Sequence, residues 1–164
     1  SAETIENQLS MFHERALPDL ENNIKCGNSL IGPDFYSIAT QGNLFSSLSD
    51  EEKENINIFD WSSEWSEFIN SSSKGFDIII GNPPYIGFHG FKNQKDYFNT
   101  KYVSADGKYD IYVLFLEKCI QLLNKNALMG FICPTAFMKR EHGKTIRSFI
   151  LQNSAEVEIV DFKH

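Results

Sequence analysis

Several features are scarce in this 164-residue sequence, and each scarcity excludes a class of protein. There are only three cysteines, Cys26, Cys119 and Cys133, and they lie far apart without the paired spacing of a metal site. We therefore expect the cysteines to be in the reduced state and to serve only as packing residues, in a cytoplasmic protein that binds no metal. No apolar run is long enough to span a bilayer, so we expect no membrane partner.

Basic residues are also scarce relative to acidic ones. The chain has 15 Lys and Arg against 22 Asp and Glu, which gives a net charge of −7 at pH 7. Proteins that grip nucleic acid neutralise phosphates with Lys and Arg. This balance argues against a chain that holds most of a DNA interface. It is compatible with a catalytic domain whose main contacts with DNA are made by another domain. The 41% hydrophobic content is enough for the core of one domain.

The ten glycines never form a Gly-x-Gly pair. Sheets that bind a dinucleotide-like cofactor place such a turn after the first strand, and an acid for the ribose hydroxyls after the second. Gly87 and Gly90 are close together, but they do not follow an apolar strand directly. A cofactor site of this kind is therefore incomplete within the sequence.

The chain is organised around the stretch from Phe76 to Tyr85. Three consecutive isoleucines, bounded by Gly75 and Gly81, predict a strand that is buried on both faces of a parallel sheet. Proline lacks the N–H that a strand ladder needs, so the strand ends before Pro83. Asn-Pro-Pro-Tyr then lies just beyond the carboxyl end of a strand, which is where open α/β sheets bind ligands.

These four residues form a rigid turn with a specific chemistry. A turn locked by Pro83 and Pro84 can direct the Asn82 side-chain oxygen and the Pro83 carbonyl to one point, which suits an NH2 group. The Tyr85 ring can stack on a planar ligand. Two acceptors on an aromatic amine would localise the nitrogen lone pair for attack on a strong electrophile. The alternative is a plain turn that ends a strand.

Asn-Pro-Pro-Tyr after such a strand resembles the catalytic motif of S-adenosylmethionine-dependent amino-methyltransferases, with Asn82, Pro83, Pro84 and Tyr85 as the catalytic residues. Members of this family methylate adenine N6 in DNA, and some relatives methylate protein glutamine. The tetrapeptide alone does not separate the two substrates. The fold implied is α/β, a partial Rossmann-like, doubly wound class I methyltransferase domain.

The remaining pattern predicts a succession of elements. Apolar positions predict a helix within residues 3–17, a helix at 110–124 and a helix at 141–151. Apolar runs predict strands at 127–133 and 157–162, and residues 24–31 predict a short strand followed by a polar turn and an apolar anchor. The long segment 86–108, rich in glycine and aromatics, is either a mobile lid with rings and lysines for DNA or an insertion whose aromatics pack locally.

The resemblance also implies binding residues. Asn28 would contact the adenine amine of S-adenosylmethionine, although such a residue is otherwise a turn former. Phe115 would touch the cofactor adenine, and a role in the core is its alternative. Lys139, Arg140 and Lys144 belong to the one dense basic cluster, which would meet DNA phosphate or else form a solvated face.

The succession of elements is similar to the middle and later motifs of adenine-N6 methyltransferases in single-chain (type IIG) restriction–modification enzymes, from about Leu17 to His164. Residues 1–164 would then be the middle and C-terminal part of a catalytic domain, with the N-terminal S-adenosylmethionine motifs and the target-recognition domain outside the chain. The parent would methylate a flipped adenine in double-stranded DNA. The alternatives are protein glutamine N5-methylation and an inactive binding fragment. We expect the isolated chain to be inactive and to self-associate through open sheet edges.

Overall fold

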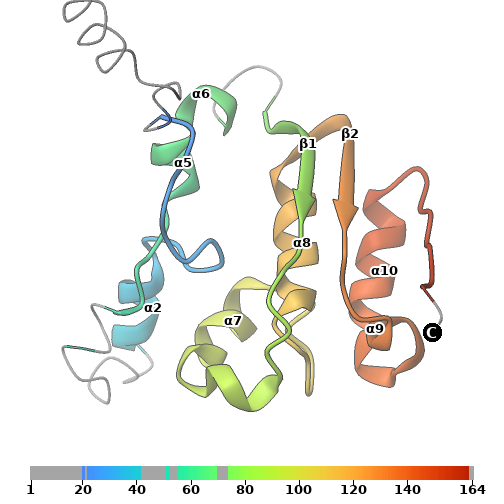
Figure 1. Ribbon diagram of the computed structural model, residues 1–164. Coiled ribbons are helices and arrows are strands. Elements are labelled where there is room, and N and C mark those ends of the chain that lie inside the picture. The colour runs from blue at the N-terminus through green and yellow to red at the C-terminus, as the bar shows by residue number, and fades with distance from the viewer. Residues whose placement is uncertain (1–19, 21, 42–50, 52–54, 70–73, 163–164) are drawn as a thin grey trace, which may run out of the picture.

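The computed structural model describes residue 20 and residues 22–41, 51, 55–69 and 74–162 (Figure 1). The helix predicted within residues 3–17 lies outside these ranges. The structure has the following elements: α2 (Phe35–Gln41), α5 (Trp61–Glu64), α6 (Ser66–Ile69), β1 (Phe76–Gly81), η1 (Phe88–Gln94), α7 (Lys95–Lys101), α8 (Tyr112–Leu122), β2 (Leu123–Phe131), α9 (Ala136–Lys139), η2 (Glu141–Gly143) and α10 (Lys144–Asn153).

β1 and β2 form a two-stranded parallel sheet, so the chain is an α/β protein. Ile78 pairs with Leu128 and Gly81 with Phe131. Gly75 precedes β1 with a φ of +128°, and a Cβ there would lie 2.6 Å from the Leu122 carbonyl oxygen. Only glycine allows the chain to pass so close to β2 in this backbone conformation. The strand predicted at Ile78 is confirmed, and the second strand begins at Leu123, four residues earlier than expected.

The two faces of this sheet differ in burial. One face packs, through Met129 and Phe131, against a group of residues from α8 and α10 that we call the sheet cluster. Its buried members are Tyr112, Val113, Leu116 and Ile146. The other face is open, and Ile78 and Ile80 are 62% and 83% exposed. The expectation that this strand is buried on both faces is wrong for this chain, since the described residues cover only one of them.

A second core lies on the other side of α8. We call it the aromatic cluster. It joins α8, the 86–111 segment and the described residues between 20 and 69, which we call the N-terminal segment. Its buried members are Leu30, Ile31, Phe35, Ile56, Phe91, Tyr97, Phe98, Tyr102, Tyr109 and Leu114. The alternative of a packed insertion therefore describes the 86–108 segment, and its rings are not free platforms for bases. The segment contains η1 and α7 rather than an irregular loop.

The helix predicted at 110–124 is present as α8, and one of its charged side chains is buried. Glu117 is fully buried and accepts hydrogen bonds from the backbone N–H groups of Val103 (3.0 Å) and Ser104 (2.7 Å). Gln121 donates a third hydrogen bond to it. A buried carboxylate is stable only when it is bonded in this way. Glu117 therefore fixes the turn after α7 on α8.

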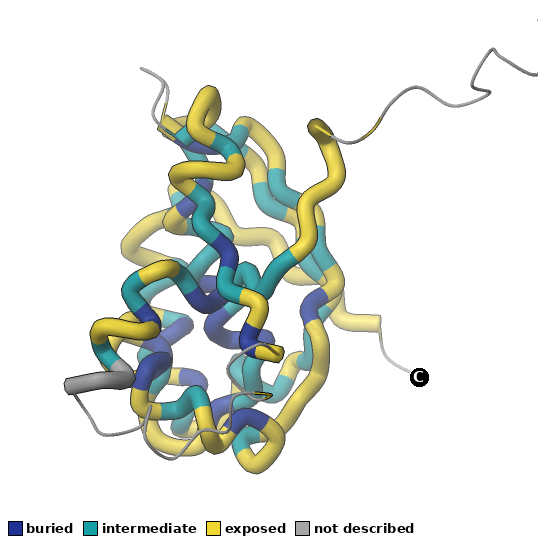
Figure 2. Tube along the Cα trace, turned by 90° about the vertical axis from the view of Figure 1, so that its left-hand side faces the viewer, coloured by how far each residue is buried: buried dark blue, intermediate teal, exposed yellow. Residues whose placement is uncertain are grey.

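Two predicted strands are absent. The stretch 24–31 contributes a single bridge, between Asn28 and Ile58, and residues 157–162 form no strand. Figure 2 shows the stretch before the C-terminus as exposed chain, and no described strand lies beside it to complete a ladder. The helix predicted at 141–151 is confirmed as η2 followed by α10. None of the helices in the described ranges is long and apolar enough to cross a membrane.

Candidate active site

The Asn-Pro-Pro-Tyr turn, residues 82–85, leaves the carboxyl end of β1. The Ile132 N–H donates to the Gly81 carbonyl oxygen at 3.1 Å, so the chain that follows β2 runs beside the start of the turn. Pro83 is buried, while Asn82 and Pro84 are exposed. Pro83 therefore anchors the turn, and the two polar side chains of the motif stand at the edge of the sheet.

Tyr85 joins the ends of the two strands. Its hydroxyl lies 3.0 Å from Asn82 Oδ1 and 3.1 Å from the Ile132 carbonyl oxygen, and its single proton is available to either acceptor. Its side chain is 55% exposed. The structure thus brings the Asn82 and Tyr85 side chains together beside the residue that follows β2, and the Tyr85 ring remains accessible.

Tyr112, at the start of α8, supports this ring from behind. It makes edge-to-face contacts with Tyr85 (6.5 Å between ring centroids) and with Phe137 (6.3 Å). Burial raises the pKa of Tyr112 to about 12, and the nearby charge of Asp110 adds to the effect. Tyr112 therefore stays neutral at physiological pH and packs the turn against the segment that follows β2.

Asn28 lies in a tight loop of the N-terminal segment, residues 28–32, which we call the Asn28 loop. Its Oδ1 accepts a hydrogen bond from the Leu30 N–H at 3.2 Å, and its own N–H donates to the Asn57 carbonyl oxygen at 2.6 Å. An amide oxygen has two lone pairs, so one of them is still able to accept from a ligand. The side chain is a turn former, and it is half-buried.

Phe115 and the Asn28 loop meet at the same core. Phe115 is half-buried and packs against the aromatic cluster, of which Leu30 and Ile31 are members. The two predicted cofactor residues thus lie on segments that share one cluster.

The predicted nucleic-acid residues lie after β2. Lys139, Arg140 and Lys144 are exposed, at the end of α9 and the start of α10. Arg147 has a structural role, since its Nη1 donates to the carbonyl oxygens of Phe137 and Arg140. Lys139, Arg140 and Lys144 are therefore exposed cations, whereas Arg147 holds the loop between α9 and α10 in place.

Two lysines of the 86–108 segment have partners in the protein. Lys101 pairs with Asp34, and Lys95 lies 4.7 Å from the centre of the Phe88 ring. Lys92, another lysine of the segment, is exposed. The structure therefore favours the packed alternative for most of this segment.

Residues 3–164 match the model of a protein family described as Eco57I restriction-modification methylase. The chain belongs to this family. It is 33% identical over 150 residues to the type II restriction enzyme and methyltransferase RM.Eco57I of Escherichia coli, which covers 89% of the chain. The resemblance to restriction–modification methyltransferases is thereby confirmed.

Other relatives of this Eco57I-type methylase chain are type II methyltransferases. The chain is 33% identical over 99 residues to M.BstVI of Geobacillus stearothermophilus and 27% identical over 118 residues to M.AccI of Acinetobacter calcoaceticus. These alignments cover 59% and 69% of the chain. The chain spans 13% of the length of RM.Eco57I, 17% of M.BstVI and 21% of M.AccI.

Sequence reasoning missed the polar contacts that join α7 to the N-terminal segment. Tyr97 and Tyr102 hydrogen-bond to residues 30–34, and Asp34 takes part in the same network. The four-residue spacing of Phe98 and Tyr102 indicates one packed face of a helix, but it does not identify polar partners. The partners of Tyr97 and Tyr102 lie more than 60 positions earlier and cannot be read from local spacing.

Proposed function

We propose that this chain is the middle and C-terminal part of the catalytic domain of an adenine-specific DNA methyltransferase in a restriction–modification system. Membership of the family and the names of the relatives support methyl transfer. The observation that carries the proposal is the Asn-Pro-Pro-Tyr turn. An amide oxygen and an accessible aromatic ring lie together at the carboxyl edge of a parallel sheet, with 3.0 Å between the Tyr85 hydroxyl and Asn82 Oδ1.

The turn suits an aromatic amine as the methyl acceptor. Asn82 Oδ1 and the Pro83 carbonyl accept hydrogen bonds from the two amine protons, and the Tyr85 hydroxyl occupies only one of the two lone pairs on Asn82 Oδ1. Held in this way, the nitrogen keeps its lone pair out of the ring and becomes a nucleophile. S-adenosylmethionine supplies the electrophilic methyl group when it is bound. Tyr85 stacks on the base.

Adenine N6 is paired inside duplex DNA, so the base is flipped out before it reaches the turn. The exposed ring of Tyr85 offers it a stacking surface. Lys139, Arg140 and Lys144 follow β2 and contact DNA phosphates. These cations favour DNA over the alternative acceptor, a protein glutamine, which has no phosphate.

The residues present fit one end of S-adenosylmethionine. Asn28, whose Oδ1 has one lone pair bonded to the Leu30 N–H, would accept from the adenine amine of the cofactor with the other, and Phe115, at the edge of the aromatic cluster, would contact its ring. The sequence has no Gly-x-Gly turn for the methionine and ribose portions. We infer that those groups, and the strands that complete a doubly wound class I sheet, come from other parts of a longer enzyme. The isolated chain then has no useful cofactor affinity and no activity.

The test uses the full-length protein that contains this chain, supplied with methyl-labelled S-adenosylmethionine. Label should enter adenine N6 of DNA and should not enter a protein acceptor. Asn82→Ala should lower the rate of methyl transfer by 10²–10³, about 2.7–4 kcal/mol in transition-state stabilisation, because the amine loses a fixed acceptor.

Asn153→Ala is the matched control. Asn153 is the last residue of α10, and its side chain only donates to the Phe149 carbonyl oxygen, so this variant should keep the original rate. Near-normal transfer by a folded Asn82→Ala enzyme would contradict the catalytic assignment. Label in protein glutamine rather than DNA would select the alternative acceptor.

A further inference from the structure

We propose that Tyr97 and Tyr102 are positioning residues that hold the Asn28 loop in place from the segment that directly follows the Asn-Pro-Pro-Tyr turn. The inference rests on the proposed function, because it takes the Asn28 loop to be part of the cofactor site. It assigns a role in cofactor affinity to two residues that lie in neither the turn nor the loop.

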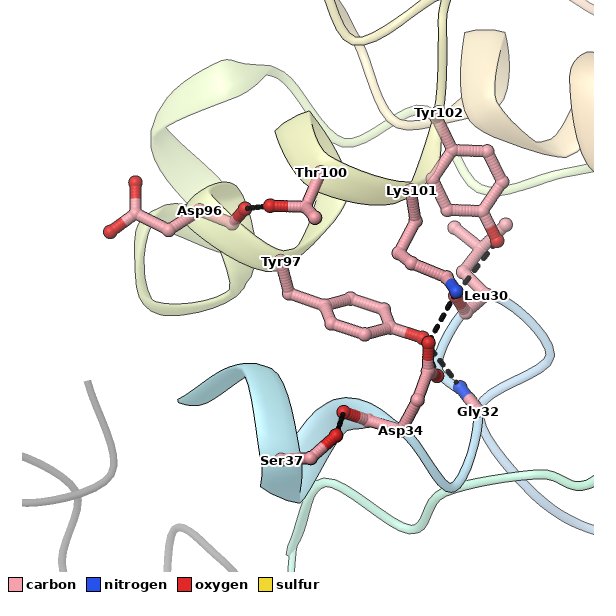
Figure 3. A network of polar contacts seen from close by, with 9 residues as sticks. All are labelled: Leu30, Gly32, Asp34, Ser37, Asp96, Tyr97, Thr100, Lys101 and Tyr102. Carbon is pink, nitrogen blue, oxygen red and sulfur yellow. Dashed lines mark hydrogen bonds and ion pairs between the residues drawn. The ribbon is translucent and has the colours of Figure 1, made fainter. Parts of the chain in front are cut away.

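Two tyrosine hydroxyls reach the backbone of the Asn28 loop (Figure 3). The Tyr102 hydroxyl donates to the Leu30 carbonyl oxygen at 2.8 Å, and the Tyr97 hydroxyl accepts from the Gly32 N–H at 2.9 Å. Tyr97 also donates to Asp34 Oδ1 at 2.9 Å, and Lys101 pairs with the other oxygen of that carboxylate. α7 and the residue that follows it therefore hold the middle of the loop, at Leu30, and its end, at Gly32.

The Tyr102 contact falls on the same residue, Leu30, that the Asn28 side chain binds. The Leu30 carbonyl is bonded to Tyr102, and the Leu30 N–H is bonded to Asn28 Oδ1. A shift of the Leu30 backbone therefore changes where the Asn28 side chain points. Other polar contacts of the loop, among them those from Trp61 to the Ser29 carbonyl, from Phe59 to the Ile31 carbonyl and from Asn28 to the Asn57 carbonyl, stay within residues 28–61.

Both tyrosines are buried, at 2% and 6% exposure for Tyr97 and Tyr102. Burial raises the pKa of each hydroxyl well above the usual value for tyrosine, so both remain protonated donors at physiological pH. At Asp34, burial opposes ionisation, but hydrogen bonds from Lys101 and Tyr97 and the charge of Lys101 outweigh it and lower the pKa. Tyr97 and Tyr102 therefore stay neutral, and Asp34 stays ionised, at pH values near 7.

The other end of this support is the Asn-Pro-Pro-Tyr turn. Ile86 follows Tyr85 directly, and its carbonyl oxygen accepts a hydrogen bond from the Ile111 N–H at 2.9 Å, which closes the base of the 86–111 segment. Between these ends the segment packs as one body in the aromatic cluster. The loop proposed to contact the cofactor and the turn proposed to hold the base are thus joined through α7.

The test compares Tyr102→Phe and Tyr97→Phe in the full-length protein that contains this chain. Each variant keeps its ring and loses one hydroxyl, so the cluster stays filled. We expect the dissociation constant for S-adenosylmethionine to rise about fivefold to tenfold in Tyr102→Phe, which leaves a buried carbonyl without its donor, and about threefold in Tyr97→Phe. The methyl-transfer rate at saturating cofactor should be unchanged. Hydrogen exchange at Leu30–Gly32 should be faster.

Tyr109→Phe is the control. Tyr109 is buried in the same aromatic cluster, but its hydroxyl approaches Asn99 Oδ1 at 3.4 Å and its ring contacts Phe88 and Phe91. The affinity of the Tyr109→Phe variant for the cofactor should stay within twofold of that of the wild-type enzyme.

Three results would overturn the inference: unchanged affinity in both Tyr102→Phe and Tyr97→Phe, an equal loss of affinity in Tyr109→Phe, or a fall in the saturated rate with affinity unchanged. Failure of the proposed function gives a different result. A wild-type enzyme that binds S-adenosylmethionine but transfers no methyl group to DNA would contradict the proposed function. The cofactor affinities of the variants would still decide whether Tyr97 and Tyr102 are positioning residues.

Discussion

β1 and the 86–111 segment adjoin in the chain but differ in what covers them. The isoleucines on the open face of β1 lie at the surface, with Ile80 83% exposed, whereas Phe98 of α7 is 1% exposed. The 86–111 segment carries many of its packing partners within itself and meets others in residues 30–35, Ile56 and α8. β1 has no such partners within its own segment, because the faces of a parallel sheet are covered by helices from other parts of a chain. The burial of β1 therefore depends on whether those helices are present.

This contrast bears on the two halves of the proposed site. The Asn-Pro-Pro-Tyr turn lies at the open sheet and presents an exposed ring, while the Asn28 loop is held by buried tyrosines. One half is accessible to a large substrate, and the other is rigidly positioned. Such a division suits an enzyme that admits a flipped base beside a fixed cofactor site.

The largest expected effect separates the stabilities of the two regions. Phe98→Ala should lower the free energy of unfolding of the purified chain by about 3–5 kcal/mol, because it leaves a cavity in the aromatic cluster. Ile80→Ala, its counterpart on the open strand face, should change it by less than about 0.5 kcal/mol. Urea unfolding followed by circular dichroism measures both. Similar losses would show that β1 is covered in solution and would remove the contrast.

A second effect concerns what the open face does in solution. Ile78 and Ile80 expose an apolar surface beside an unpaired strand edge, which predicts self-association of the purified chain. Ile80→Lys should weaken that association by about tenfold, since a lysine on the face opposes its burial. Sedimentation velocity over a range of concentrations gives the constant.

Ser148→Lys serves as the control, because it adds the same charge at an exposed position of α10 and should leave association unchanged. A wild-type chain that sediments as a monomer at every concentration would show that the open face does not bind another copy.

The smallest expected effect is the response of the aromatic cluster to alkali. Burial raises the pKa of Tyr109 to about 12, with a further contribution from Asp96. A raised pKa means that the stabilisation is fully present below the ordinary tyrosine pKa of about 10 and is lost as the pH rises towards 12. The chain should therefore lose stability above pH 10. Tyr109→Phe should reduce that loss by about 1 kcal/mol at pH 11.

Urea midpoints measured from pH 8 to pH 11 give this difference directly. Identical pH profiles for the chain and for Tyr109→Phe would show that the Tyr109 hydroxyl is not desolvated in the folded protein. An unchanged midpoint at pH 8 confirms that the substitution preserves the packing of the ring.

Local pattern was sufficient for the elements that depend on neighbouring residues. The isoleucine run gave β1, the 3.6-residue periodicity gave α8 and α10, and the prolines placed the turn at a strand end. The juxtaposition of Asn82 and Tyr85 also agrees with the motif, because only two residues, both with rigid rings, separate them.

Other features depend on contacts between distant positions, and only the tertiary structure decided them. Glu117 is buried because the turn after α7 brings two N–H groups to it, and the 86–111 segment is ordered because residues 30–35 pack against it. A strand at 157–162 needs a neighbouring strand, and the described part of the chain provides none there. By itself, the sequence determined the local backbone geometry and the chemistry of the turn. The fold decided which side chains lose their water, since desolvation depends on every segment that comes together in space.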